Sequence, residues 1–298
     1  MLSKRETLED RIFITILFVI LFIAVAIVLY PLIYMLSCSV STPQYIGSGA
    51  VWLFPKGLNI IGYQRVFQDP AIMTGYANTL FYATAGTAIN IVVTVPAGYS
   101  LSKATLPGRK FFTLFFLFIM YFSGGMIPSF LLIKNLGLYN TRIVLIVLGA
   151  FSAYNCIICR TFFASIPQEL EDAAAIDGCS PMRSFIQIAL PISQALLGVM
   201  TLYFIVGHWN SYFSAMMYTI DQKYAPLQLI LRRILILEQA STEMLAESTD
   251  SEYMMELSKV RELIKYAVIV VSSLPLLIIY PFLQKYFVKG VLIGSVKG

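Results

Sequence analysis

Long apolar runs alternate with short polar segments along this chain. Six of the apolar windows reach the roughly 20 residues that a helix needs to cross the hydrocarbon core of a bilayer. They cover residues 12–36, 76–101, 111–133, 143–163, 184–207 and 266–287. The third window contains Gly124, Gly125 and Pro128, which predict a bend that faces protein rather than lipid. The pattern therefore predicts an all-α integral membrane protein with six transmembrane helices.

Composition supports a membrane protein. The chain is 58% hydrophobic and only 12% charged, whereas a soluble domain has about 25% charged residues. The formal net charge of +5 does not indicate a nucleic-acid partner, because the basic residues form short clusters between apolar runs rather than a stripe.

The basic clusters predict the orientation of the spans. With the N-terminus inside, eleven basic residues are cytoplasmic: Lys4, Arg5, Arg11, Lys103, Arg109, Lys110, Arg160, Arg183, Lys285, Lys289 and Lys297. The short outer loops hold Lys56, Arg65, Lys134 and Arg142. By the positive-inside rule, residues 1–11, the loop 164–183 and the C-terminus are cytoplasmic, and the segment 208–265 is extracytoplasmic. Residues 12–298 then form a single transmembrane domain.

The first window has two alternative interpretations, a signal peptide or, because of Cys38, a lipoprotein leader. Its apolar core is too long for a typical signal, and no small-residue pattern precedes Cys38. We expect it to be a retained span.

A polar segment from Ile166 to Ser193 interrupts the apolar second half of the chain. Ser165, Pro167 and Gln168 predict a helix start, Gly178 predicts its end, and Ser180 with Pro181 begins a second helix that meets Pro191. Four residues share one face of the first helix by helical spacing: Leu170, Ala173, Ala174 and Asp177. Glu169 and Asp172 lie on an adjoining acidic face. An ordinary amphipathic loop helix is the alternative to a docking loop.

The spacing within this segment is similar to the EAA motif of permeases in ATP-binding-cassette importers. The matching positions are Asp172, Ala173, Ala174, Gly178, Ile188, Leu190 and Pro191. Asp172 replaces the usual Glu, which keeps the charge but shortens the side chain. Ile166-Pro167 and Ile176-Asp177-Gly178 resemble carbohydrate permeases related to MalG. Four further stretches resemble the LplC/YtcP-type branch, assigned to complex oligosaccharides: Asn59–Tyr63, Phe122–Gly125, Trp209–Phe213 and Pro226–Gln228.

The resemblance implies a MetI/MalG-like permease subunit of an oligosaccharide importer in a bacterial cell membrane. It implies a homologous second permease, cytoplasmic ATPase subunits that bind ATP and Mg²⁺, and an extracytoplasmic sugar-binding protein. The 166–180 loop would be the coupling helix. Its expected ATPase-coupling residues are Glu169, Glu171, Asp172, Ala173, Ala174, Asp177 and Gly178, with the acidic ones meeting basic or N–H groups. A bulky residue at Gly178 is expected to uncouple transport.

The spans contain almost no charged residue, although ion-driven carriers need titratable or coordinating groups at membrane depth. The chain also lacks a G-x-x-x-x-G-K-[ST] phosphate-binding loop, so energy must come from another subunit. The single histidine, His208, lies beside Trp209 at a span end, where an interfacial role is favoured. One histidine cannot complete a Ser/His/Asp, Cys/His or metal site, so we do not expect an enzyme. An ion-coupled carrier and a non-transporting scaffold remain the alternatives.

Neutral polar residues inside the spans are candidates for a sugar path. Thr87, Asn90 and Thr94 share one face of the second span, and Tyr154 and Asn155 lie in the fourth. Hydrogen bonds between packed helices are the alternative use of such residues. Cys156 and Cys159 have CxxC spacing, but in an apolar helical run we expect them to pack as small hydrophobes.

The extracytoplasmic segment has two parts. Helical spacing of Leu227, Ile230, Leu231, Ile234 and Leu235 predicts an amphipathic helix at the surface or against a partner. Residues 243–262 are acidic and polar, which fits either a solvated flap or a contact surface for a binding protein.

Overall fold

The structure is a computed structural model that describes residues 8–236 and 263–281. The chain divides into two compact units, one of residues 1–69 and 233–271 and the other of residues 70–232 and 272–298. Within the described residues, three helices are long and apolar enough to cross a membrane, or up to five when each of two bent helix pairs is counted as one span. The protein is therefore an all-helical membrane protein.

The first unit contains α1 (Leu8–Ser39), α2 (Pro43–Gly47) and α3 (Ile61–Gln68). The last described helix, Leu263–Pro281, begins in this unit. Cys38, Ile46, Val51 and Leu263 form its small core. Ser39 and Tyr63 share a hydrogen bond of 2.7 Å between their hydroxyl oxygens. Cys38 thus packs as a buried apolar side chain at the end of α1.

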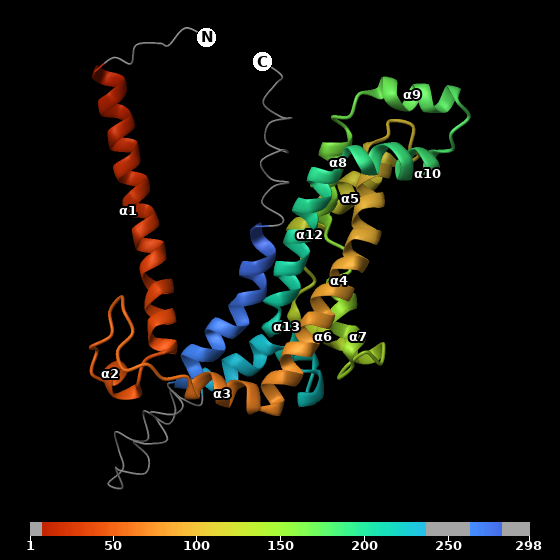
Figure 1. The fold of residues 1–298 in the computed structure, drawn as a ribbon. Helices are drawn as coiled ribbons and strands as arrows, with labels where there is room; N and C mark the ends of the chain where they lie inside the picture. The colour runs from red at the N-terminus through yellow and green to blue at the C-terminus, as the bar shows by residue number, and fades with distance from the viewer. Residues whose placement is uncertain (1–7, 237–262, 282–298) are drawn as a thin grey trace. The chain divides into compact units, whose positions relative to one another are not determined.

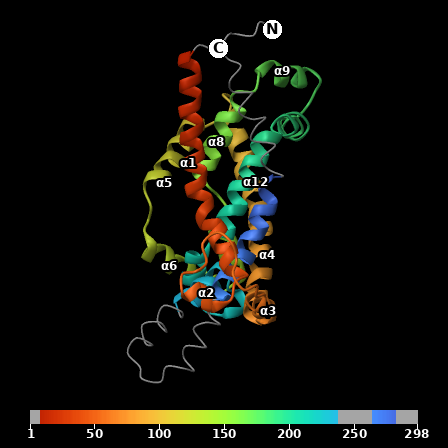
Figure 2. The same cartoon turned by 60° about the vertical axis from the view of Figure 1, so that its left-hand side comes forward.

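The second unit is built around α4 (Pro70–Ser102), which packs along both α8 (Ala153–Phe163) and α12 (Gln194–Trp209). Figures 1 and 2 show these three helices side by side. Gly98 permits part of this packing, because a Cβ atom there would lie 2.4 Å from the Cβ atom of Cys159. Cys159 and Cys156 are free and fully buried, so the interpretation of them as packing residues is supported.

Two of the predicted spans are bent. The third predicted span forms α5 (Arg109–Tyr121) and α6 (Met126–Asn135), which meet at 112°. Gly125 has φ +88° at the break, so the expected bend at the glycine pair is confirmed. The fifth predicted span begins with α10 (Pro181–Ser184), a π-helical turn η1 (Phe185–Ala189) and α11 (Leu190–Ile192). It then turns by 84° into α12, close to Pro191, which has no backbone N–H to donate.

The fourth predicted span, residues 143–163, is not one helix. It divides into α7 (Arg142–Val147) and α8, with residues 148–152 between them. The side-chain amide of Asn90 donates to the carbonyl oxygen of Gly149 in this gap, and Ser152 caps α8 by accepting a bond from the N–H of Asn155. These bonds satisfy backbone groups that the interrupted helix leaves without partners.

Short elements close the second unit at the end away from Ser102. They are α13 (Tyr212–Tyr218) and the 3-10 turn η2 (Gln222–Tyr224). A helix over residues 227–236 follows, which confirms the helical prediction there. The sequence placed this helix at the surface or against a partner, whereas the structure buries its first turn against α4. Thr79 accepts a bond of 2.8 Å from the N–H of Leu227, and Leu227 is fully buried. Residues 243–262 lie outside the described residues.

Candidate functional site

The polar segment singled out in the sequence forms helix α9, Gln168–Ile176. Its end has the paired hydrogen bonds of a Schellman motif. The N–H of Cys179 donates to the carbonyl oxygen of Ala174 (2.9 Å), and the N–H of Gly178 donates to that of Ala175 (3.0 Å). Gly178 has φ +75°, a left-handed conformation that glycine adopts at little cost. The predicted stop at Gly178 is confirmed.

The predicted start of this helix is right in position but wrong in its cap. The hydroxyl of Ser165 donates backwards to the carbonyl oxygen of Phe162 (2.7 Å), and Pro167 occupies the N-cap position. Ser165 still belongs to the turn that ends α8, so its side chain satisfies that helix instead. Ser180 does cap α10, as predicted, by accepting a bond from the N–H of Arg183.

Helix α9 lies beyond the ends of α4 and α8 in both views (Figures 1 and 2). Its inner face lines a cleft of about 490 Å³ between α9 and the α4–α5 loop. The α9 residues of that face are Gln168, Glu171, Asp172 and Ala175. Lys103, Arg109 and Ser184 line the cleft from the other elements. Two of the expected coupling residues, Glu171 and Asp172, therefore face this cleft.

The outer face of α9 is exposed. It carries Glu169, Ala173 and Ile176, with Asp177 at the C-cap. Ile176 is 87% exposed, which is more than Leu170, the other large apolar residue of α9, at 42%. The face predicted from spacing is divided by the fold, because Ala174 is only 6% exposed whereas Leu170, Ala173 and Asp177 remain exposed.

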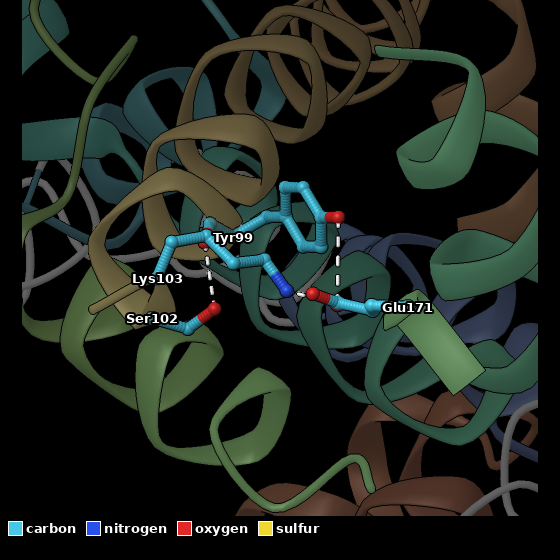
Figure 3. A network of polar contacts seen from close by, with 4 residues as sticks. All are labelled: Tyr99, Ser102, Lys103 and Glu171. Atoms are coloured by element: carbon cyan, nitrogen blue, oxygen red, sulfur yellow. Dashed lines mark hydrogen bonds and ion pairs between the residues drawn. The ribbon is translucent and has the colours of Figure 1, made fainter. Parts of the chain in front are cut away.

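Glu171 has a partner within its own chain. Its Oε1 atom forms an ion pair with the Nζ atom of Lys103, the residue that follows α4. The hydroxyl of Tyr99 donates a long hydrogen bond of 3.5 Å to the same oxygen, and the ammonium of Lys103 lies 4.1 Å from the centre of the Tyr99 ring. Figure 3 shows the three side chains converging.

Tyr99 also belongs to the core of the second unit. Its ring centre lies 5.3 Å from that of Phe163 in α8 and 4.8 Å from that of Phe185 in η1. All three aromatic side chains are buried in one cluster with Met200 and Phe204 of α12. The end of α4 is therefore packed against the last turn of α8, in the fourth predicted span, and against η1, at the start of the fifth.

The sequence favoured an interfacial role for His208, and the structure buries its side chain between helices. It is 7% exposed, and its Nε2 atom lies 2.7 Å from Oδ1 of Asn90. Gly86 of α4 makes room for the imidazole, since a Cβ atom there would lie 2.4 Å from Nε2. His208, Asn90 and Gly149 thus form a polar connection between α12, α4 and the break between α7 and α8.

Beside this connection lies a pocket of about 320 Å³. Its polar lining consists of Asn90, Ser152, Asn155, Tyr203, His208, Ser211 and Ser214. Among the residues that the structure describes, no Asp, Glu, Lys or Arg lines it, so this lining offers hydroxyl, amide and imidazole groups as donors and acceptors. Such groups suit the hydroxyls of a sugar.

The pocket contains only two of the five residues predicted for the substrate path, Asn90 and Asn155. Thr87 and Thr94 are buried away from it, and their hydroxyls have no hydrogen-bond partner in the part of the chain that the structure describes. Tyr154 points out of the unit and is 60% exposed.

Sequence reasoning missed Lys103, Tyr99, Tyr203 and Ile176 as site residues. A signal for Lys103 was available, because a basic residue at the end of one predicted span and an acidic loop helix lay on the same predicted side. Ile176 was detectable as the large apolar residue next to the predicted helix end at Gly178. Nothing local in the sequence distinguishes Tyr99 or Tyr203 from the other 16 of the chain's 18 tyrosines.

No family model matches the chain, but individual proteins do. Protein LplC of Bacillus subtilis (strain 168) is 38% identical over 273 residues, covering 92% of this chain and 90% of LplC. The polygalacturonan/rhamnogalacturonan transport system permease protein YtcP of the same organism is 35% identical, covering 98% of this chain and 100% of YtcP.

A solved structure has the same fold. The crystal structure of a bacterial ABC transporter involved in the import of the acidic polysaccharide alginate contains a chain that is 34% identical. The TM-score is 0.84, and the match covers 96% of this chain and 100% of that chain. Given these identities over nearly the full length, the chain belongs to the permeases of carbohydrate ATP-binding-cassette importers, the non-catalytic membrane subunits of sugar and oligosaccharide import systems.

Proposed function

We propose that this permease forms half of the translocation path of an oligosaccharide importer, with a homologous second permease forming the other half. Six spans would cross the membrane: α1, α4, α5 with α6, α7 with α8, α10 to α12, and the helix that begins at Leu263. Two cytoplasmic ATPase subunits would bind ATP and Mg²⁺, and an extracytoplasmic binding protein would deliver the sugar.

The end of the second unit that carries α9 would face the cytoplasm. This orientation is supported by the basic residues at that end, Lys103, Arg109, Lys110, Arg160 and Arg183. The ion pair between Lys103 and Glu171 supports placing loops 103–108 and 164–183 on the same side. Both termini would then be cytoplasmic, and the acidic residues 243–262 would be outside, available as a flap or to a binding protein.

Helix α9 would be the coupling helix, with its outer face in a groove of an ATPase subunit. The observation that carries this is the exposure of Ile176 together with Glu169, Ala173 and Asp177 on a helix beyond the ends of the spans. Closure of the ATPase subunits on ATP would push α9, and the spans would swing between inward-open and outward-open states.

The substrate would pass the neutral pocket beside His208. Asn90 and Asn155, together with Tyr203, would hydrogen-bond sugar hydroxyls as the chain of rings moves through. Thr87, Thr94 and Tyr154 are weaker candidates, because none of them lines the pocket. The names of YtcP and of the alginate importer make oligosaccharides that contain uronic acids the first substrates to test.

Reconstitution of the full importer in proteoliposomes tests the function. Uptake of a radiolabelled oligogalacturonate or oligoalginate should require the binding protein outside and ATP on the ATPase side. An ion-coupled carrier would instead take up sugar on an imposed proton or sodium gradient without ATP. Binding without uptake under any condition would indicate a scaffold. Either result would overturn the proposal.

A further inference from the structure

We propose that Glu171 and Lys103 form a latch, the α4–α9 latch, which ties the coupling helix to the end of α4. This inference rests on the proposed function of α9. The covalent chain links α9 only to α8 on one side and to α10 on the other. Through the latch, a push on α9 would also reach α4, the helix at the centre of the second unit.

The geometry gives the latch a defined position. Glu171 lies in the first turn of α9, and Lys103 directly follows the last residue of α4. A carboxylate at a helix N-terminus and an ammonium at a helix C-terminus are each favoured by the helix dipole. The ion pair therefore joins two groups that are already in favourable places, 68 residues apart in the sequence.

Hydrogen bonds and an aromatic contact hold the end of α4 in place. The hydroxyl of Ser102 donates to the carbonyl oxygen of Tyr99 (2.7 Å) (Figure 3). The Nε atom of Arg109 donates to the carbonyl oxygen of Leu101 (3.0 Å). Both bonds satisfy carbonyl groups that the end of a helix otherwise leaves open. The Lys103 ammonium lies over the face of the Tyr99 ring, and the same ring packs on Phe163 of α8 and Phe185 of η1.

The exposure of the pair limits what it can do. The side chains of Lys103 and Glu171 are 25% and 21% exposed, and pairs that water reaches contribute little to stability. The pair therefore adds little to the stability of the fold, and we infer that its role is to fix the position of α9 relative to the end of α4. Arg109 and Asp172 also face the cleft, but the structure gives neither of them an ion pair with Lys103 or Glu171 in its described part.

The latch changes the role expected of Glu171. Its carboxylate is engaged with α4 rather than offered to the ATPase, whereas Glu169 and Asp177 remain outward. Loss of Glu171 should therefore impair transmission and leave the ATPase subunit attached.

A charge exchange tests this. The importer carrying this permease as Lys103→Glu, as Glu171→Lys and as the double exchange is reconstituted, and sugar transported per ATP hydrolysed is measured together with the amount of copurified ATPase. Each single reversal should lower the transport-to-hydrolysis ratio by about fivefold or more, because it replaces attraction with repulsion. The double exchange should restore at least half of the ratio.

Glu169→Lys is the matched control, since it makes the same charge change on the outer face of the same helix. Lys103→Glu should not rescue it. Because Glu169 is on the outer face, Glu169→Lys is expected to reduce the amount of copurified ATPase. The latch is overturned if the single reversals leave the ratio unchanged, if the double exchange is as poor as the singles combined, or if Glu171→Lys also reduces the copurified ATPase. Failure of the unmodified importer to use ATP at all would instead reject the proposed function.

Discussion

The Nε2 atom of His208 lies 2.7 Å from the Oδ1 atom of Asn90, across 118 residues of sequence. Asn90 also donates from its amide to Gly149, so one asparagine joins a histidine of α12 to the backbone break between α7 and α8. Such bonds in a transmembrane core contribute about 1 kcal/mol each. Their importance here is that they fix where the fourth predicted span is interrupted, next to the neutral pocket.

Gly86→Ala should disrupt this connection. The added Cβ atom would lie 2.4 Å from Nε2 of His208, so the imidazole would have to move away from Asn90. Overpacking of this kind costs about 1–3 kcal/mol. Thermal unfolding of the detergent-purified protein should show a lowered midpoint. Gly207→Ala is the matched control in α12, because a Cβ atom there meets nothing within 4 Å. Equal midpoints for the two variants would argue against the connection.

Gly178 should tolerate asparagine better than alanine or valine. The sequence led us to expect that side-chain bulk is what Gly178 excludes. Among the described residues, however, no atom lies within 4 Å of an added Cβ atom, so within this chain the backbone conformation is the constraint. At φ +75°, alanine costs about 1–2 kcal/mol, whereas asparagine visits this region readily. ATP hydrolysis stimulated by the loaded binding protein should fall in the order Gly178→Asn, Gly178→Ala, Gly178→Val. A valine variant as active as the asparagine variant would contradict this.

Ile176→Asp should weaken attachment of the ATPase subunit. Burial of an isoleucine side chain in a partner's groove contributes about 1.5–3 kcal/mol, so a loss of roughly tenfold or more in affinity is expected. Copurification through a tag on this permease measures it. Ile176→Leu should retain the ATPase. Ile220→Asp provides a second control, because Ile220 is also exposed (65%) but lies far from α9. It follows α13 at the end of the second unit away from Ser102, where its N–H donates to Oδ1 of Asn140. Full retention of the ATPase by Ile176→Asp would remove the outer face of α9 from the interface.

Asn155→Ala and Tyr203→Phe should raise the KM for sugar uptake and leave ATPase copurification unchanged. Each removes a hydrogen-bonding side-chain group from the neutral pocket, and a lost hydrogen bond of about 0.5–1.5 kcal/mol corresponds to roughly a twofold to thirteenfold change. Thr161→Ala is the control in α8, the helix of Asn155, because the Thr161 hydroxyl donates to the carbonyl oxygen of Ile157 and does not line the pocket. Unchanged KM values in both pocket variants would place the sugar path elsewhere.

Much of the segment around α9 could be predicted from the sequence, because its signals are local. The left-handed turn at Gly178 and the cap at Ser180 depend on residues within a few positions of each other, and both appear in the structure. Ser165 shows the limit of that reasoning. Its hydroxyl could accept a bond from an N–H in the first turn of α9 or donate to a carbonyl oxygen at the end of α8, and in the structure it donates to Phe162.

The sequence by itself determined that this is a helical membrane protein with a short loop helix that ends at Gly178, since apolar length and helix caps are properties of short stretches of chain. It could not determine that residues 143–163 break at Gly149, that His208 is buried, or that Glu171 faces Lys103. Each of these depends on side chains 59 to 118 residues apart meeting across packed helices. Helical periodicity assigns a residue to a face, but only the packing of the other helices decides which face is inside.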